Sequence, residues 1–104
     1  MPSRWPSTSA DDLIERMRAA VVDGPGTLDR SVRRAAFGGR DAVPTEAASY
    51  VDKVRHHAYK VTDGDVDALK AAGWSDDALF ELTVATALGA ALARREIALK
   101  AMGR

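Results

Sequence analysis

Apolar residues recur every three or four positions along most of this chain, which is the spacing of one buried helical face. The clearest case runs from Ala47 to Val61, where the apolar positions are separated by four, three, four and three residues. Tyr50 and His57 flank this face. Strand-like alternation of apolar and polar residues is found nowhere in the sequence, so the pattern predicts an all-α protein with about five helices.

Capping residues and helix-stopping glycines divide the chain into these helices. Residues 1–8 hold two prolines and three serine or threonine residues, so we expect a flexible tail ahead of a single domain over residues 9–104. The first helix is expected to begin at Ser9, which can cap the amides that follow. It is expected to stop at residues 24–26, Gly-Pro-Gly.

Two further helices are expected next. Thr27 is placed to cap a short helix that Gly38 ends, and Pro44 opens the third helix. The arginines of the second helix are expected to point away from its apolar side. That side is formed by Leu28, Val32, Ala35 and Ala36.

The segment after the third helix carries three boundary signals in succession. Thr62 and Asp65 have the spacing of a capping box with a short acid. Gly73 suits a left-handed C-cap, and Ser75 suits the N-cap of the next helix. A two-turn helix is therefore expected over residues 65–72.

The last helix, expected over residues 76–102, is apolar on nearly every side. Between Ala78 and Ala93 only Glu81, two threonines and Gly89 interrupt the apolar residues. Its small residues allow another helix to approach closely. A helix of this kind is either central to its domain or buried in a partner, and 104 residues offer little protein to surround it. The sequence therefore predicts a homo-oligomer formed through the last helix.

Composition narrows the classes of function. Fifteen basic and fifteen acidic side chains cancel, so no overall field favours nucleic acid or a membrane surface. The chain has no cysteine and no spacing of histidines typical of a zinc site, so no cofactor or metal is expected. The most apolar stretch is shorter than the roughly 20 residues that span a membrane. With no apolar leader, the expected location is the cytoplasm.

The stretch from Val61 to Thr83 reads V-T-D-x-D-V-x-x-L-x-x-A-G-W-S-D-D-x-x-x-E-L-T. It resembles the second half of the alkylhydroperoxidase D / carboxymuconolactone decarboxylase-like family, and the likeness covers about residues 44–100. The resemblance implies an all-helical fold that assembles as a dimer, trimer or hexamer. Redox members use a Cys-x-x-Cys pair served by a His and a Glu, so the lack of cysteine argues against thiol peroxidase activity. The decarboxylase branch does not depend on that pair and stays open.

Two residues are candidates for acid–base chemistry. Glu81 lies one turn inside the apolar helix, where an unpaired carboxylate is costly to bury. It is either a general base or proton carrier, or a structural partner of Arg33, Arg55 or His57. A third alternative leaves it at the surface near the start of the helix. His57 is either an acid or base at a pocket wall or a boundary histidine bonded to a carbonyl. Its neighbour His56 points about 100° away, so the two cannot grip one metal ion.

Four arginines give the second helix and the loop after it a local excess of positive charge. Arg33 and Arg34 are the candidate residues for binding a phosphate, a small anionic ligand or an acidic partner. The alternative is a solvated helix face, which is common for charge runs of this size. The four residues are Arg30, Arg33, Arg34 and Arg40.

The leading interpretation is a self-associating binding or scaffold protein with the resembled fold and without its redox centre. One alternative is a non-redox enzyme of decarboxylase or lactone-processing type. It would use His57 and Glu81 in a pocket between subunits, with an arginine holding the substrate carboxylate. A second alternative is an accessory partner of a cysteine-bearing member of the family.

Overall fold

The computed structural model describes residues 7–39 and 43–103, and in these ranges the chain is helical apart from short connections, with no strand. Five α-helices follow one another, which confirms the all-α prediction. Residues 1–6 of the tail expected over residues 1–8 lie outside the described residues, as does Arg40. The helices are α1 (Ser7–Arg18), α2 (Arg30–Gly38), α3 (Thr45–His56), α4 (Asp63–Ala71) and α5 (Asp76–Ala101), with a π-helical segment η1 (Ala19–Asp23) after α1 and a 3-10 turn η2 (Ala58–Lys60) after α3.

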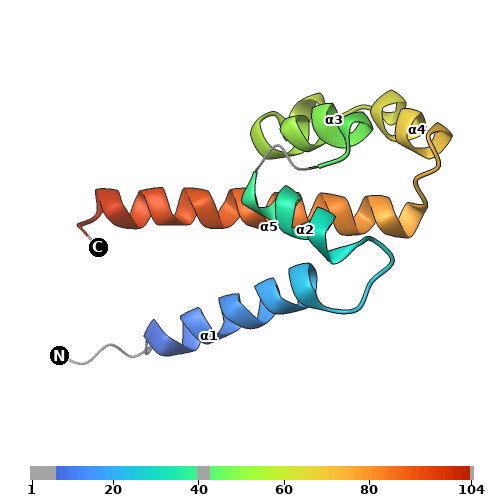
Figure 1. Ribbon diagram of the computed structural model, residues 1–104. Coiled ribbons are helices and arrows are strands. Elements are labelled where there is room, and N and C mark those ends of the chain that lie inside the picture. The colour runs from blue at the N-terminus through green and yellow to red at the C-terminus, as the bar shows by residue number, and fades with distance from the viewer. Residues whose placement is uncertain (1–6, 40–42, 104) are drawn as a thin grey trace.

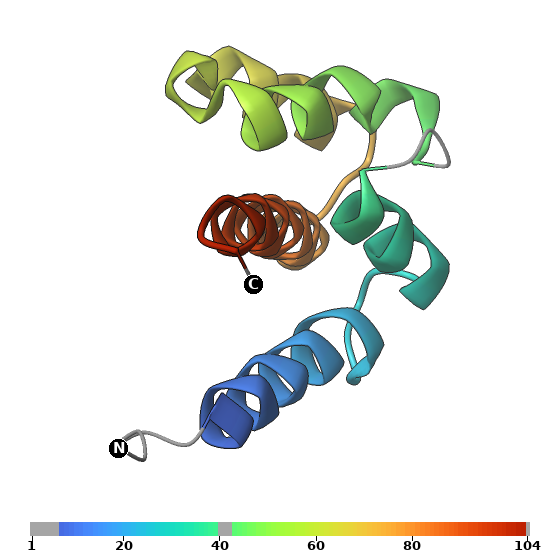
Figure 2. The same ribbon diagram turned by 90° about the vertical axis from the view of Figure 1, so that its left-hand side faces the viewer.

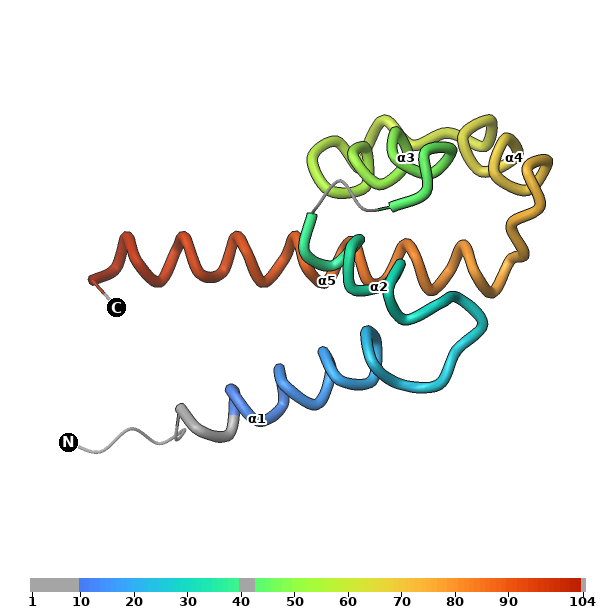
Figure 3. Tube along the Cα trace, in the orientation of Figure 1, coloured from blue at the N-terminus to red at the C-terminus, as the bar shows by residue number. Residues whose placement is uncertain are grey.

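Helix α5 is the axis about which the other helices are arranged (Figure 1). Viewed along this axis, α3 lies above α5, α2 beside it and α1 below it, and one side of α5 is left uncovered (Figure 2). The trace shows the last turns of α5 running past the end of α2 (Figure 3). The radius of gyration is 15.6 Å, whereas a closely packed chain of this length would give about 13 Å. The molecule is therefore elongated.

The core lies where α2 and α3 meet the first half of α5. Leu82 of α5, Ala36 of α2 and Ala47 of α3 belong to one cluster, and each is fully buried. Gly89 continues the contact, because a Cβ atom there would collide with the carbonyl oxygen of Phe37 and lie 2.7 Å from its carbonyl carbon. The small residues of α5 thus admit a neighbouring helix, as predicted, and that helix is α2 of the same chain.

The boundary signals after α3 form as predicted. The Thr62 hydroxyl accepts a hydrogen bond from the backbone N–H of Asp65, whose carboxylate accepts one from the backbone N–H of Thr62. Gly73, with φ of +103°, ends α4 in a Schellman arrangement, in which the N–H of Trp74 donates back to a carbonyl of the last turn. The Ser75 hydroxyl caps α5. Local capping chemistry therefore fixes the joint between α4 and α5.

Two boundaries near the N-terminus differ from the predictions. Helix α1 begins at Ser7, two residues before the predicted Ser9. Thr27 does not cap α2, which begins at Arg30. The backbone N–H of Thr27 instead donates to Glu81, so Thr27 belongs to a loop held from outside.

The predicted end of the third helix is also wrong. The apolar spacing extends to Val61, but α3 stops at His56 because His57 leaves the helical region with φ of −146° and ψ of 52°. A 3-10 turn then carries the chain to Val61. Both Val54 and Val61 still pack against the core. The periodic spacing therefore predicted correctly that these two valines contact the core but not where the helix ends, because the chain bends after His56 and brings α4 beside α3.

Replacing Gly89 with alanine tests the contact between α2 and α5. G89A should lower the free energy of unfolding by about 2 kcal/mol or more, because overpacking exceeds the gain of roughly 1 kcal/mol in helix propensity. G64A in α4 is the matched control, since the nearest atom to its Cβ would be 3.6 Å away. G64A should leave stability unchanged or raise it by up to about 1 kcal/mol. Urea unfolding followed by circular dichroism measures both, and equal effects would contradict the close contact.

The ion pair between Lys53 and Asp65 makes a second prediction, on pH dependence. Lys53 Nζ donates to Asp65 Oδ1 (2.8 Å), and this bond, assisted by the backbone N–H of Thr62, lowers the pKa of Asp65. A lowered pKa contributes stability above the unfolded value of about 3.9, and that stability is lost as the pH falls through the folded pKa. Carboxyl-carbon NMR should show Asp65 titrating below 3.9. In the K53M variant the pKa of Asp65 should rise, and an unchanged value would show that Lys53 is not what lowers it.

Candidate functional site

Glu81 lies on the second turn of α5 and joins this helix to the loop between η1 and α2. Its Oε2 accepts a hydrogen bond from the backbone N–H of Thr27 (3.0 Å), and its Oε1 accepts one from the N–H of Leu28 (3.3 Å). Bonds of this kind are charge-assisted. Within the described residues Glu81 makes no ion pair, so two backbone amides stabilise its half-buried charge instead of the cationic partners that the sequence suggested.

Arg33 is 4% exposed, which corrects the expectation that it points away from the apolar side. Its Nε donates to the carbonyl of Leu28 (3.1 Å), and its Nη1 donates to the carbonyl of Val21 (3.2 Å). The Val21 carbonyl belongs to the last turn of η1, where carbonyls lack partners inside the helix. Arg33 is buried because it lies three and four residues before Ala36 and Phe37, which share its side of α2.

Gly26 brings the two charged side chains to one place. A Cβ atom on Gly26 would collide with the Glu81 carboxylate and would lie 3.5 Å from Cζ of Arg33. The bare backbone of the loop therefore lies against both groups. The structure thus brings together Arg33 and Glu81, two of the four predicted site residues, whose opposite charges both lie against Gly26.

A cavity of about 220 Å³ adjoins these two residues, between η1 and α5. Five of its seven lining residues are apolar, and the other two are the charged pair. Turns of π-helix are rare and frequently lie at functional sites, so the presence of η1 in this wall marks the cavity as the candidate site. Its lining residues are Ala20, Val21, Pro25, Arg33, Phe80, Glu81 and Val84.

His57 does not lie in this cavity. It is exposed at the end of α3, and its ring meets that of Tyr59 edge-on at 6.1 Å. The C-terminal end of α3 lies beside Arg94 of α5, because Arg94 Nη2 donates to the carbonyl of Arg55 (2.7 Å). Arg94 lies about 20 Å farther along α5 than Glu81. The structure therefore separates His57 from Glu81 within one chain, and their joint catalytic role stays a prediction.

Arg34 is also outside the cavity. Its Nε donates to Asp23 Oδ1 (2.7 Å), and Arg18 Nη1 donates to Asp23 Oδ2 (3.2 Å). These contacts, with Arg34 the stronger, hold the pKa of Asp23 below its ordinary value. Arg30 is exposed. An anion at Arg34 would compete with the carboxylate of Asp23. Arg34 thus differs from Arg33 both in position and in partner, since Arg34 pairs with a carboxylate and Arg33 donates to backbone carbonyls.

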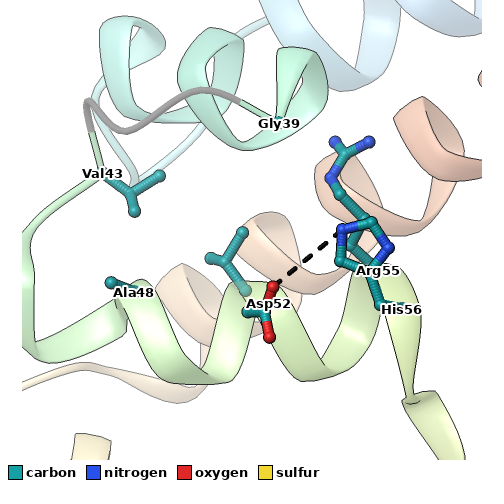
Figure 4. A pocket seen from close by; sticks show the side chains of 7 residues that line it. Gly39, Val43, Ala48, Asp52, Arg55 and His56 are labelled. Atoms are coloured by element: carbon teal, nitrogen blue, oxygen red, sulfur yellow. Dashed lines mark ion pairs between the residues drawn. The ribbon is translucent and has the colours of Figure 1, made fainter.

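A second cavity, of about 170 Å³, lies between the end of α2 and α3 (Figure 4). Arg55 extends across it, and its Nη2 donates to the carbonyls of Ala36 (2.7 Å) and Phe37 (2.8 Å). These carbonyls end α2, where a cation is favourable. His56 faces Asp52 at 3.9 Å in the same wall. Nothing in the sequence pattern marks Arg55 for this role, because only the three-dimensional structure places it at the end of another helix.

Two further features bound the chemistry. Within residues 7–39 and 43–103, no three His, Asp or Glu side chains come together as metal ligands do. In the same ranges, each helix lacks the length or the hydropathy that crossing a bilayer requires. Comparisons of the chain with protein-family models, with curated proteins and with solved structures found no match. The function is therefore inferred from the geometry of the chain itself.

Removing the Glu81 carboxylate should release the loop between η1 and α2. We expect E81A to lower the free energy of unfolding by about 1–2 kcal/mol, since two charge-assisted hydrogen bonds are lost from a half-exposed site. Hydrogen exchange at the amides of Thr27 and Leu28 should accelerate. E96A on the exposed part of the same helix is the control and should change stability by less than about 0.5 kcal/mol. Unchanged exchange at both amides would contradict the role of Glu81.

Proposed function

We propose that this chain is a self-associating helical protein that acts by binding or scaffolding. The observation that carries the proposal is an apolar surface shared by α1 and α5 that the described chain leaves exposed or half-exposed. We call it the α1–α5 face. It consists of Ala10, Leu13, Met17 and Ala20 of α1 and η1 with Phe80, Val84, Ala87, Ala91 and Ala98 of α5.

The α5 half of this face has the spacing of a coiled-coil seam. Its apolar positions from Phe80 to Ala98 are separated by four, three, four and seven residues. Phe80 is 69% exposed, although a phenyl ring is among the most favourable groups to bury. The fully buried Leu82 points to the opposite side of α5, toward α2 and α3. One side of α5 therefore builds the core and the other is free for a partner.

The α1 half repeats the same spacing. From Ala10 to Ala20 its apolar positions are separated by three, four and three residues. Leu13 and Met17 are 55% and 44% exposed. A lone exposed leucine needs no explanation, but apolar stripes on two helices of one molecule are typical of an interaction surface.

A second copy of the chain is the partner that we propose for this face. Helices α1 and α5 from two copies would form a four-helix arrangement related by a two-fold axis. Two adjacent helices of this length present roughly 600 Å² of projected area, near the 800 Å² or so that each partner buries in a stable complex. Asp11 Oδ1 of α1 lies 3.7 Å from Arg95 Nη2 of α5. The same two side chains can also form ion pairs between the two copies.

The family resemblance supports the same proposal. Among the residues that carry it, the Thr62–Asp65 capping box, Gly73 and Ser75 act at helix boundaries, and Leu69 and Leu82 belong to the core. We propose on this basis that the chain has an alkylhydroperoxidase D-like fold without a redox centre. Because these residues are structural, they support the architecture and assembly of the family more than its chemistry.

Charges on the α1–α5 face should separate the copies. A87E and A91E would each place a carboxylate in an apolar interface, and we expect the dissociation constant to rise at least tenfold, about 1.4 kcal/mol. A68E, on an exposed site of α4, is the matched control and should leave assembly unchanged. Size-exclusion chromatography with light scattering measures the molar mass at several concentrations.

Two outcomes would contradict self-association through this face. A monomer for the unchanged chain at micromolar concentrations would remove the proposal altogether. An oligomer that withstands both A87E and A91E would show that the copies meet elsewhere.

A further inference from the structure

We propose that the cavity between η1 and α5 binds a small neutral molecule with an apolar body and one hydrogen-bond acceptor. The site borders the surface proposed for self-association, because Ala20, Phe80 and Val84 line the cavity and also belong to the α1–α5 face. Arg33 and Glu81 form its polar end, and apolar residues form the rest.

The volume of the cavity sets the size of the ligand. An apolar protein cavity of about 150 Å³ holds benzene, and a water molecule occupies about 30 Å³ of liquid. The cavity between η1 and α5, of about 220 Å³, therefore suits one ring with a short substituent. The aromatic ring of Phe80 and the side chains of Val21, Pro25 and Val84 supply surfaces for such a body.

Arg33 supplies the donor. Its Nε and Nη1 are engaged by the carbonyls of Leu28 and Val21, which fixes the guanidinium in place. Its Nη2 makes no hydrogen bond within the described residues. This atom is also not fully buried, because the one fully buried polar side-chain atom without a partner in these residues is Arg55 Nε. A rigid donor with unused capacity is therefore available to a ligand carbonyl or hydroxyl oxygen.

The charges around the cavity select a neutral ligand over an anion. The Glu81 carboxylate and the Arg33 guanidinium both lie beside Gly26, so their opposite charges partly offset each other at the polar end. An anion would lose its hydration while being attracted by one group and repelled by the other. A neutral acceptor loses less hydration and still gains the hydrogen bond. The anion site that the sequence predicts at Arg33 is therefore replaced by a site for a polar, uncharged group.

Four probes of similar shape and different charge test this selection. They are acetophenone, ethylbenzene, benzoate and benzamidine, titrated into the unchanged protein by calorimetry, with ¹⁵N spectra reporting the Arg33 Nε–H and the amides near Val84. Acetophenone should bind about tenfold more tightly than ethylbenzene, which lacks the acceptor, and more tightly than either ion. Tighter binding of benzoate or benzamidine, or no binding by any probe, would overturn the proposal.

Two variants test the location and the charge balance. A20F fills the cavity from an exposed position of η1 and should abolish acetophenone binding, whereas A68F on α4 should not change it. E81Q removes the negative charge while keeping one acceptor oxygen for the loop. In E81Q the affinity for benzoate should rise about tenfold, and benzoate should overtake acetophenone. Binding that survives A20F, or an order of probes that E81Q leaves unchanged, would overturn the assignment.

The A91E variant separates this site from self-association. Acetophenone should bind A91E at least as tightly as it binds the unchanged chain, because dissociation uncovers Ala20, Phe80 and Val84. Binding that vanishes in A91E together with the oligomer would show that two chains form the site, which would overturn the single-chain cavity. Binding that persists in a chain found to be monomeric would support the cavity while removing the proposed assembly.

Discussion

The α2 backbone approaches α5 directly at Gly89, and this contact sets how the neighbouring helices pack. Because no side chain separates Gly89 from Phe37, α2 lies deep against α5, and its buried side carries Arg33 inward. From there Arg33 reaches back to the end of η1, and Glu81 reaches forward to the same loop. One close contact between two backbones thus positions both charged groups of the cavity.

The charges of the site act mainly on backbone groups. Arg33 donates to two carbonyls, and Glu81 accepts from two amides, all of them in the loop and turn between α1 and α2. Such bonds fix a segment that has no helix or sheet partners of its own. The side chains are held in single orientations as a consequence, which is the preorganisation that a binding site needs.

Local signals in the sequence predicted local structure well. The capping box at Thr62, the left-handed Gly73 and the α5 cap at Ser75 act through neighbours within a few residues, so the sequence alone locates them. Arg33 and Arg55 could not be assigned in this way. The position of each side chain is set by carbonyls at the end of another helix, which only folding brings near. A search for apolar periodicity counts every arginine as exposed and therefore misses both.

The site was predictable in part for the same reason. Glu81 could be singled out from the sequence because a carboxylate inside an apolar helix needs a partner. Its partners are the backbone amides of Thr27 and Leu28, which have no signature in the sequence. The separation of His57 from Glu81 follows from where α3 ends along α5, which depends on packing between helices.

The π-helical turn η1 has a consequence for how this chain can vary in length. A π-turn closes its hydrogen bonds over one more residue than an α-turn, so η1 holds a local surplus of chain between α1 and the loop. Deleting one residue there would restore ordinary α-helix and rotate α1 by about 100° relative to the rest of the molecule. The apolar stripe of α1 would then no longer lie beside that of α5. A change of a single residue in length at η1 would thus alter the surface that the molecule offers to others while leaving the sequence from α2 to α5 unchanged.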